Sequence, residues 1–287
     1  ITAYYASKKE ASSSSLFVIF GVLGAILVGL GIILIIAHNW DHLSRLQKTI
    51  LAFVPLVSAQ GFCAFALIRK RENQRWVESS ATFLFFSLAA AIAMIGQIYN
   101  LPGDLPAFLM TWMLLSLPMI NIMKSSMLSM LYLIGITGYG AETGYSSQDV
   151  SEWYYWAMLL GALPHYYLLL KKHPKSYFTH IHHWLIALSL TTMLGTVAHS
   201  HEELMFIAYC SLFGLFYAIG HFSLFQTVGT LANGYKLIGA LGTLIILLIL
   251  SFEEFWSHLS QPRWQLPDVL SSPEFLVSLL ITLATTW

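Results

Sequence analysis

The chain has 287 residues, of which 57% are hydrophobic and only 10% are charged. An ordinary soluble domain carries roughly 25% charged residues, so this composition excludes a free-standing soluble fold and indicates a membrane protein. The fourteen basic and fourteen acidic residues cancel to a formal net charge of zero, which gives no support for nucleic-acid binding. We therefore expect the lipid bilayer to be the main partner of the chain.

The apolar runs, in chain order, predict an all-α, polytopic bundle of transmembrane helices. A bilayer-spanning helix needs about 20 residues, so the length leaves room for roughly nine or ten spans. We expect residues 1–287 to form a single transmembrane domain. The predicted helices cover residues 16–37, 46–68, 77–99, 105–123, 126–141, 152–170, 181–198, 203–221, 234–252 and 274–287.

Segment 126–141 is the least certain of these helices. It is short and contains Gly135, Gly138 and Gly140, each of which lowers helix propensity unless a neighbouring helix packs closely against it. The segment is compatible with a full span and with a partial or re-entrant one.

Both ends suggest a piece of a longer protein. Residue 1 is Ile rather than Met, and the last apolar run, 274–287, is too short to cross a hydrocarbon core of roughly 30 Å. We expect further residues at both ends.

The distribution of charge predicts the orientation. If the N-terminus is cytoplasmic and successive loops alternate sides, eleven of the fourteen basic residues fall inside and eleven of the fourteen acidic residues fall outside. Cytoplasmic loops carry an excess of Lys and Arg, so a cytoplasmic N-terminus is predicted. On the inner side, His173, His180, His182 and His183 accompany Lys171, Lys172 and Lys175. This grouping indicates an interfacial basic patch that faces anionic headgroups.

Polar residues near the predicted outer helix ends are candidates for an outward-facing ligand pocket. They occur in two clusters, residues 37–42 and residues 96–104. An amide such as Gln97 near the end of a span must find a hydrogen-bond partner or water, so it marks a helix contact or a polar cavity. The predicted pocket residues are Asn39, Asp41, Gln97, Tyr99, Asn100 and Asp104. The alternative is structural, because Asp104 before Leu105-Pro106 is typical of a helix N-cap.

Histidines on the same outer side suggest a divalent-metal site. The candidate ligands are His38, His42, His199, His201 and Glu202. Imidazole and carboxylate groups bind zinc or manganese, and a metal-bound water could act as the nucleophile of a hydrolase. The spacing is not a specific metal signature, and Glu202 in the first turn of a helix also complements the helix dipole without a metal.

His165, which follows Pro164 in the sixth predicted helix, is the strongest intramembrane ionisable candidate. A residue of this kind predicts a proton relay. His165 lies only about 9 Å along the helix from Lys171, so its side chain is equally compatible with the inner interface.

Two segments carry a resemblance to a known family. Residues 24–41, which end in Asn39-Trp40-Asp41, and residues 95–104, which contain Gly96-Gln97-Ile98-Tyr99, resemble bacterial polytopic membrane proteins classed as domain of unknown function 2157. The resemblance covers approximately residues 1–125. It implies a multi-pass protein of the bacterial inner membrane and places Asn39, Trp40, Asp41, Gln97, Tyr99 and Asp104 at motif positions. It implies no activity.

The sequence favours a transport or small-ligand-binding membrane protein over two alternatives. The first is a membrane-embedded metal-dependent hydrolase. The second is a non-catalytic assembly subunit whose glycine-rich faces, residues 21–31 and Gly239-x2-Gly242, bind partner membrane subunits. The chain has no phosphate-binding glycine loop and no Gly-x-Ser-x-Gly motif, so its sequence does not support nucleotide-driven transport or serine hydrolysis.

Overall fold

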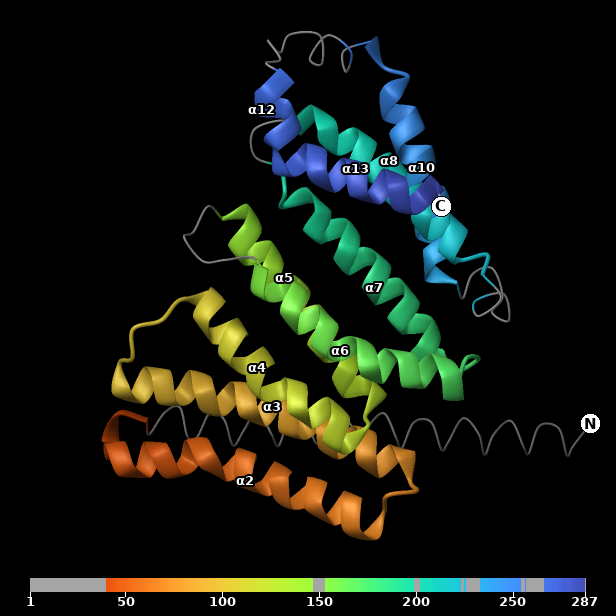
Figure 1. Ribbon diagram of the computed structural model, residues 1–287. Coiled ribbons are helices and arrows are strands. Elements are labelled where there is room, and N and C mark those ends of the chain that lie inside the picture. Colours follow the sequence, from red (N-terminus) through yellow and green to blue (C-terminus); the bar gives the residue numbers. More distant parts are fainter. Residues whose placement is uncertain are drawn as a thin grey trace, which may run out of the picture. The chain divides into compact units, whose positions relative to one another are not determined.

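The computed structural model describes residues 40–146, 153–198, 202–222, 225, 233–253, 256 and 266–286 (Figure 1). The chain divides into two compact units, Ile1–Val54 and Pro55–Trp287. In the first unit the described residues form the short helix η1 (Trp40–His42) and the beginning of α2.

Every regular element within the described ranges is a helix, which confirms the predicted all-α fold. The remaining elements are α2 (Arg45–Arg69), α3 (Gln74–Tyr99), α4 (Leu105–Met123), α5 (Ser126–Tyr145), α6 (Trp153–Lys172), α7 (Tyr177–Gly195), η2 (Glu202–Leu204), α8 (Met205–Ile219), α10 (Gly234–Leu250), α12 (Leu266–Ser271) and α13 (Pro273–Thr286). The predicted first helix, 16–37, lies outside the described residues. The short helix α12 was not predicted.

Three of the described helices, α2, α3 and α4, are long and apolar enough to cross a membrane. The helices α8, α10 and α13 are apolar but shorter, with 15, 17 and 14 residues. The chain is thus a helical protein with membrane-spanning segments. The higher number of spans and the orientation stay predictions.

The uncertain segment 126–141 is part of an unbroken helix of 20 residues, α5. Ser125 caps its N-terminus by accepting a hydrogen bond from the Leu128 amide at 3.1 Å. A Cβ atom added at Gly135 would overlap the Met113 thioether of α4, and one at Gly140 would overlap the Met193 thioether of α7. The glycines therefore let neighbouring helices pack closely against α5, which offsets their low helix propensity.

The core of the second unit forms around α5, which packs against α3, α4, α6 and α7. Its side chains Tyr132, Ile136 and Tyr139 are fully buried there. A second group of helices, α8, α10 and α13, packs together, and α10 also contacts α7. The ends of α2 to α6, rather than their middles, carry most of the charged residues, and these ends form the candidate site.

Candidate functional site

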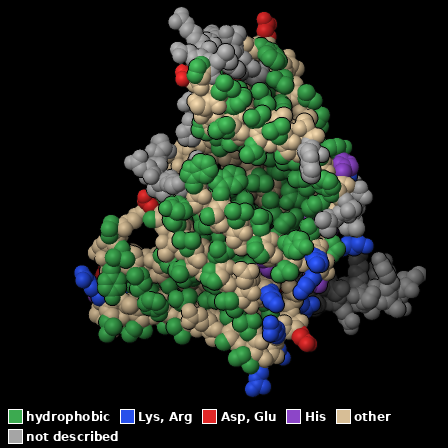
Figure 2. All heavy atoms as spheres, viewed as in Figure 1, with side chains coloured by type: hydrophobic (Ala, Val, Ile, Leu, Met, Phe, Trp, Pro, Cys, Tyr) green, Lys and Arg blue, Asp and Glu red, His purple; other side chains and the backbone are tan. Residues whose placement is uncertain are grey.

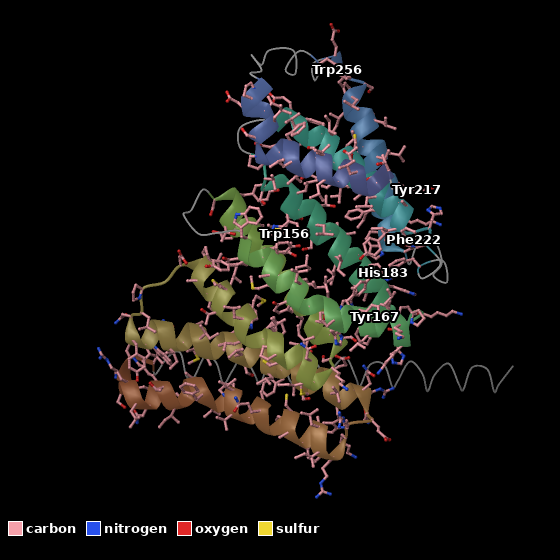
Figure 3. All side chains as sticks on the ribbon, viewed as in Figure 1. Trp156, Tyr167, His183, Tyr217, Phe222 and Trp256 are labelled. Carbon is pink, nitrogen blue, oxygen red and sulfur yellow. The ribbon has the colours of Figure 1, made fainter. Side chains whose placement is uncertain are left out.

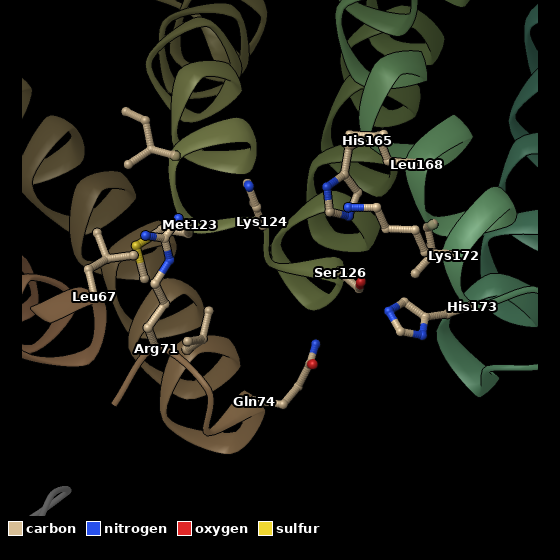
Figure 4. Close-up of a pocket in the computed structure, with 13 residues that line it drawn as sticks. Leu67, Arg71, Gln74, Met123, Lys124, Ser126, His165, Leu168, Lys172 and His173 are labelled. Carbon is tan, nitrogen blue, oxygen red and sulfur yellow. The ribbon is translucent and has the colours of Figure 1, made fainter. Parts of the chain in front are cut away.

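A cavity of about 280 Å³ opens between the turns that join α2 to α3 and α4 to α5 and the C-terminal end of α6 (Figure 4). We call this cavity the cationic pocket. Its polar lining comes from Arg71, Gln74, Lys124, Ser126, His165, Lys172 and His173. Its apolar lining comes from Leu67, Val77, Ile122, Met123, Leu168 and Leu169.

Local sequence explains why the helices end at this cavity. The Asn73 side chain caps α3 by accepting a hydrogen bond from the Arg75 amide at 3.2 Å. Lys124 adopts a left-handed conformation with φ 51°, which ends α4 immediately before the Ser125 cap of α5. At the end of α6, Lys171 and Lys172 complement the negative end of the helix dipole. Two tight turns and one helix terminus thus bring cations to one place.

The buried carboxylate of Glu78 on α3 caps the start of α5 and binds two residues that line the pocket, Gln74 and Ser126. One oxygen accepts hydrogen bonds from the Ser126 amide and from Gln74 Nε2, both at 2.9 Å. The other accepts from the Met127 amide at 2.9 Å and from the Ser125 hydroxyl. The Glu78 charge is therefore stabilised by four donors and by the positive end of the α5 dipole, and it forms no ion pair with the pocket cations.

The pocket carries an excess of positive charge. Arg71, Lys124 and Lys172 supply three fixed cations, and none of the thirteen lining residues is acidic. Within the described part of the chain, none of these three cations takes part in an ion pair. Figure 2 shows Lys and Arg side chains gathered in one region of the visible face, next to His side chains. A concave site lined by one sign of charge concentrates ligands of the opposite sign.

His165 of α6 adds a polar group to the interior of the pocket. Its side chain is 7% exposed, and its Nε2 atom has no hydrogen-bond partner among the described residues. Buried polar atoms are nearly always partnered, so an unpartnered nitrogen at a cavity indicates that a ligand or water completes it. In Figure 4 the His165 ring lies on the same side of the cavity as Lys172.

Beyond His165, the polar residues form two separate groups. The His182 ring lies 6.3 Å from the His165 ring and makes hydrogen bonds to Phe178 O at 2.7 Å and to Ser129 Oγ at 3.0 Å. His183 (Figure 3) is fully buried, and its ring lies 5.4 Å from that of Tyr235.

The second polar group lies deeper between α5, α6 and α7. There Ser189 Oγ lies 2.5 Å from Thr137 Oγ1 and 2.6 Å from the Tyr155 hydroxyl. Ser129 and Thr137 are about 12 Å apart along α5, with the buried Leu133 and Ile136 between them. The hydrogen bonds therefore do not join the two groups, and the relay role of His165 stays a prediction.

Four residues of the predicted outward-facing pocket lie together at the turn from α3 to α4, at the opposite ends of these helices from the cationic pocket. Asn100 ends α3 in a left-handed conformation, and its amide donates to Gln97 O at 3.4 Å. Asp104 caps α4 by accepting from the Ala107 amide at 2.8 Å, which confirms its capping role. The side chains of Gln97, Tyr99, Asn100 and Asp104 are all exposed. Their role in binding a ligand stays a prediction.

The other predicted site residues lie in the first unit, at the start of η2, or outside the described residues. Asp41 and His42 lie exposed in η1, whereas Asn39 lies outside the described residues. The candidate metal ligands His38, His199 and His201 also lie outside them, and Glu202 begins η2. Within the described ranges, no three His, Cys, Asp or Glu residues are grouped so that they could hold a metal ion. The metal site stays a prediction.

Comparison with known proteins identifies part of the chain. Residues 1–129 match the family model described as "Predicted membrane protein (DUF2157)". The first 129 residues of the chain are therefore similar to this family of predicted membrane proteins. This match confirms the resemblance drawn from the sequence, and it ends within the first turns of α5. The matched residues include Arg71 and Lys124, whereas His165 and Lys172 lie beyond them. The chain has no match among curated proteins or solved structures.

The charge distribution places most of the basic residues on the inner side, but it does not predict that Arg71, Lys124 and Lys172 share a cavity. The available signal was the recurrence of cations in three successive loops on that side. Sequence cannot show that these loops meet, because this depends on how α3, α5 and α6 pack.

Proposed function

We propose that the protein is a membrane protein that binds a small anionic ligand in the cationic pocket. The observation that carries this proposal is one cavity without an acidic lining residue, surrounded by His165 and three cations that have no ion-pair partner among the described residues. Ligand pockets usually have volumes of roughly 300–1,000 Å³, so a cavity of about 280 Å³ suits a small ligand. The sequence also favours small-ligand binding, although it predicts a pocket on the outer side and from other residues.

The lining residues offer complementary donors for an anion. The Arg71 guanidinium presents a planar fork that pairs with two oxygens of one ligand, and the ammonium groups of Lys124 and Lys172 act as point charges. At the base, the Ser126 hydroxyl and His165 Nε2 add hydrogen-bonding groups that are shielded from water. Charge-assisted hydrogen bonds are the stronger ones, so affinity depends mainly on the cations.

The same proposal places the protein in a bacterial inner membrane with the cationic pocket at the cytoplasmic side. The support is the excess of Lys and Arg in the loops on that side and the bacterial location that the sequence resemblance of residues 24–41 and 95–104 implies. A pocket at this surface would draw its ligand from the cytoplasm or from the inner leaflet.

Binding is tested with inorganic phosphate as the probe and the full chain purified in detergent. We expect phosphate at saturation to raise the melting temperature by roughly 2–10 °C, because a ligand that binds only the folded state stabilises it. The double variant K124A/K172A should lose this shift. The matched control K70A/K175A removes two exposed lysines that do not line the pocket and should keep it. No shift in the native protein, or equal shifts in both variants, would contradict the proposal.

A further inference from the structure

We infer that the anion bound by the cationic pocket is the phosphate-bearing headgroup of an anionic membrane lipid. This inference rests on the proposed function and names the ligand class for the same site. It depends on three features of the pocket, namely its position at the ends of candidate membrane spans, its apolar wall and its number of cations.

The pocket lies where candidate membrane spans end. It is lined by residues at or next to the C-terminal ends of α2 and α4 and at the N-terminal end of α3. These are the three helices that are long and apolar enough to cross a membrane. Helix ends of this kind leave the hydrocarbon core at the level of the lipid headgroups. Basic pockets between helices at this level are suited to phosphate-bearing headgroups.

One wall of the pocket is continuous with apolar surface. Ile122 and Leu168 line the cavity, yet they are 62% and 45% exposed. A free inorganic anion makes no favourable contact with such side chains. A lipid with its phosphate among the cations can lay its glycerol and first acyl carbons along Ile122 and Leu168, which removes apolar surface from water.

The number of cations favours a phosphomonoester over a ligand with a single negative charge. Arg71, Lys124 and Lys172 together supply three positive charges. A phosphomonoester carries up to two negative charges and three acceptor oxygens, enough to engage all three side chains and His165 Nε2. A zwitterionic headgroup would bring its own ammonium among the pocket cations, so it is disfavoured.

The inference is tested with the full chain in phosphatidylcholine nanodiscs that contain phosphatidic acid as a minor component. After transfer to detergent, native mass spectrometry measures how many phosphatidic acid molecules each protein retains. We expect the K124A/K172A variant to retain phosphatidic acid about tenfold less than the native protein, because two cations of the pocket are lost. The K70A/K175A control should retain it as the native protein does.

A second variant separates a lipid from a free anion. I122S/L168S replaces the exposed apolar wall and leaves every cation in place. It should lower the retention of phosphatidic acid several-fold while the melting-temperature shift with inorganic phosphate is unchanged. Displacement of the retained lipid by inorganic phosphate would support a shared site.

Two results would overturn the inference while the proposed function stands. One is a phosphate shift that depends on Lys124 and Lys172 without any retained phosphatidic acid, which would identify a free anion as the ligand. The other is a phosphate-dependent melting-temperature shift that still requires Lys124 and Lys172, together with an equal loss of retained phosphatidic acid in K124A/K172A and K70A/K175A. Such a result would mean that general surface charge, rather than the pocket, retains the lipid. Absence of both phosphate binding and lipid retention would refute the proposed function as well.

Discussion

The buried Glu78 carboxylate illustrates how a single residue positions the cationic pocket. It joins α3 to the start of α5 by accepting hydrogen bonds from two backbone amides and from the Ser125 hydroxyl, and it thereby satisfies the N-terminus of α5.

The variant E78Q tests this capping role. Its side-chain NH2 group replaces one of the two acceptor oxygens, so the buried backbone amide of Ser126 or Met127 would lose its hydrogen-bond acceptor. We expect the free energy of unfolding in mixed micelles to fall by about 2 kcal/mol. The control E72Q alters an exposed residue of the preceding turn and should change it by less than about 0.5 kcal/mol. Equal stability of the two variants would refute the capping role.

The same residue shows where sequence reasoning stops. From the sequence, Asp104 is predicted to be a helix cap, whereas no such role is predicted for Glu78. The Asp104 cap is visible because its donor, the Ala107 amide, is three residues away. Glu78 reaches donors at positions 125 to 127, 47 to 49 residues further along the chain. Local spacing in the sequence therefore predicts contacts between residues a few positions apart. Contacts between two different inter-helix turns depend on how the helices pack, which local spacing does not contain.

At the scale of helices, apolar runs predicted the elements well because each span must satisfy its own backbone hydrogen bonds. The predicted helix 105–123 coincides with α4, and 46–68 differs from α2 by one residue at each end. The largest errors at a single helix end were four residues, at the start of α7 and at the end of α5, where glycines were weighed as helix breakers. Gly140 instead accommodates the Met193 side chain, a role that depends on a partner helix and is not visible in the sequence.

Close packing of α8 and α10 provides a test at the same scale. A Cβ atom at Gly239 would lie 2.7 Å from both the Phe213 carbonyl oxygen and the Tyr217 amide nitrogen, which belong to the rigid backbone of α8. We expect G239A to lower the free energy of unfolding by about 2 kcal/mol, because the helices must move apart. G138A places its Cβ in open space and should leave stability unchanged or slightly higher. Thermal unfolding in detergent measures both, and a G239A protein as stable as G138A would contradict the packing.

For the whole molecule, the decisive property is which side of the membrane the cationic pocket faces. Sequence predicts the cytoplasm, since eleven of the fourteen Lys and Arg residues fall on that side. Lys175 lies near the pocket end, and Gly103 lies in the turn at the opposite end of α3 and α4. The two native cysteines, Cys63 and Cys210, are first replaced by Ala. A membrane-impermeant maleimide applied to intact cells should then label the G103C variant and leave the K175C variant unlabelled. After the cells are lysed, the maleimide should label both variants. Labelling of K175C in intact cells would place the pocket outside. In that case its ligand would come from the outer leaflet, and lipid retention would have to be tested with outer-leaflet lipids.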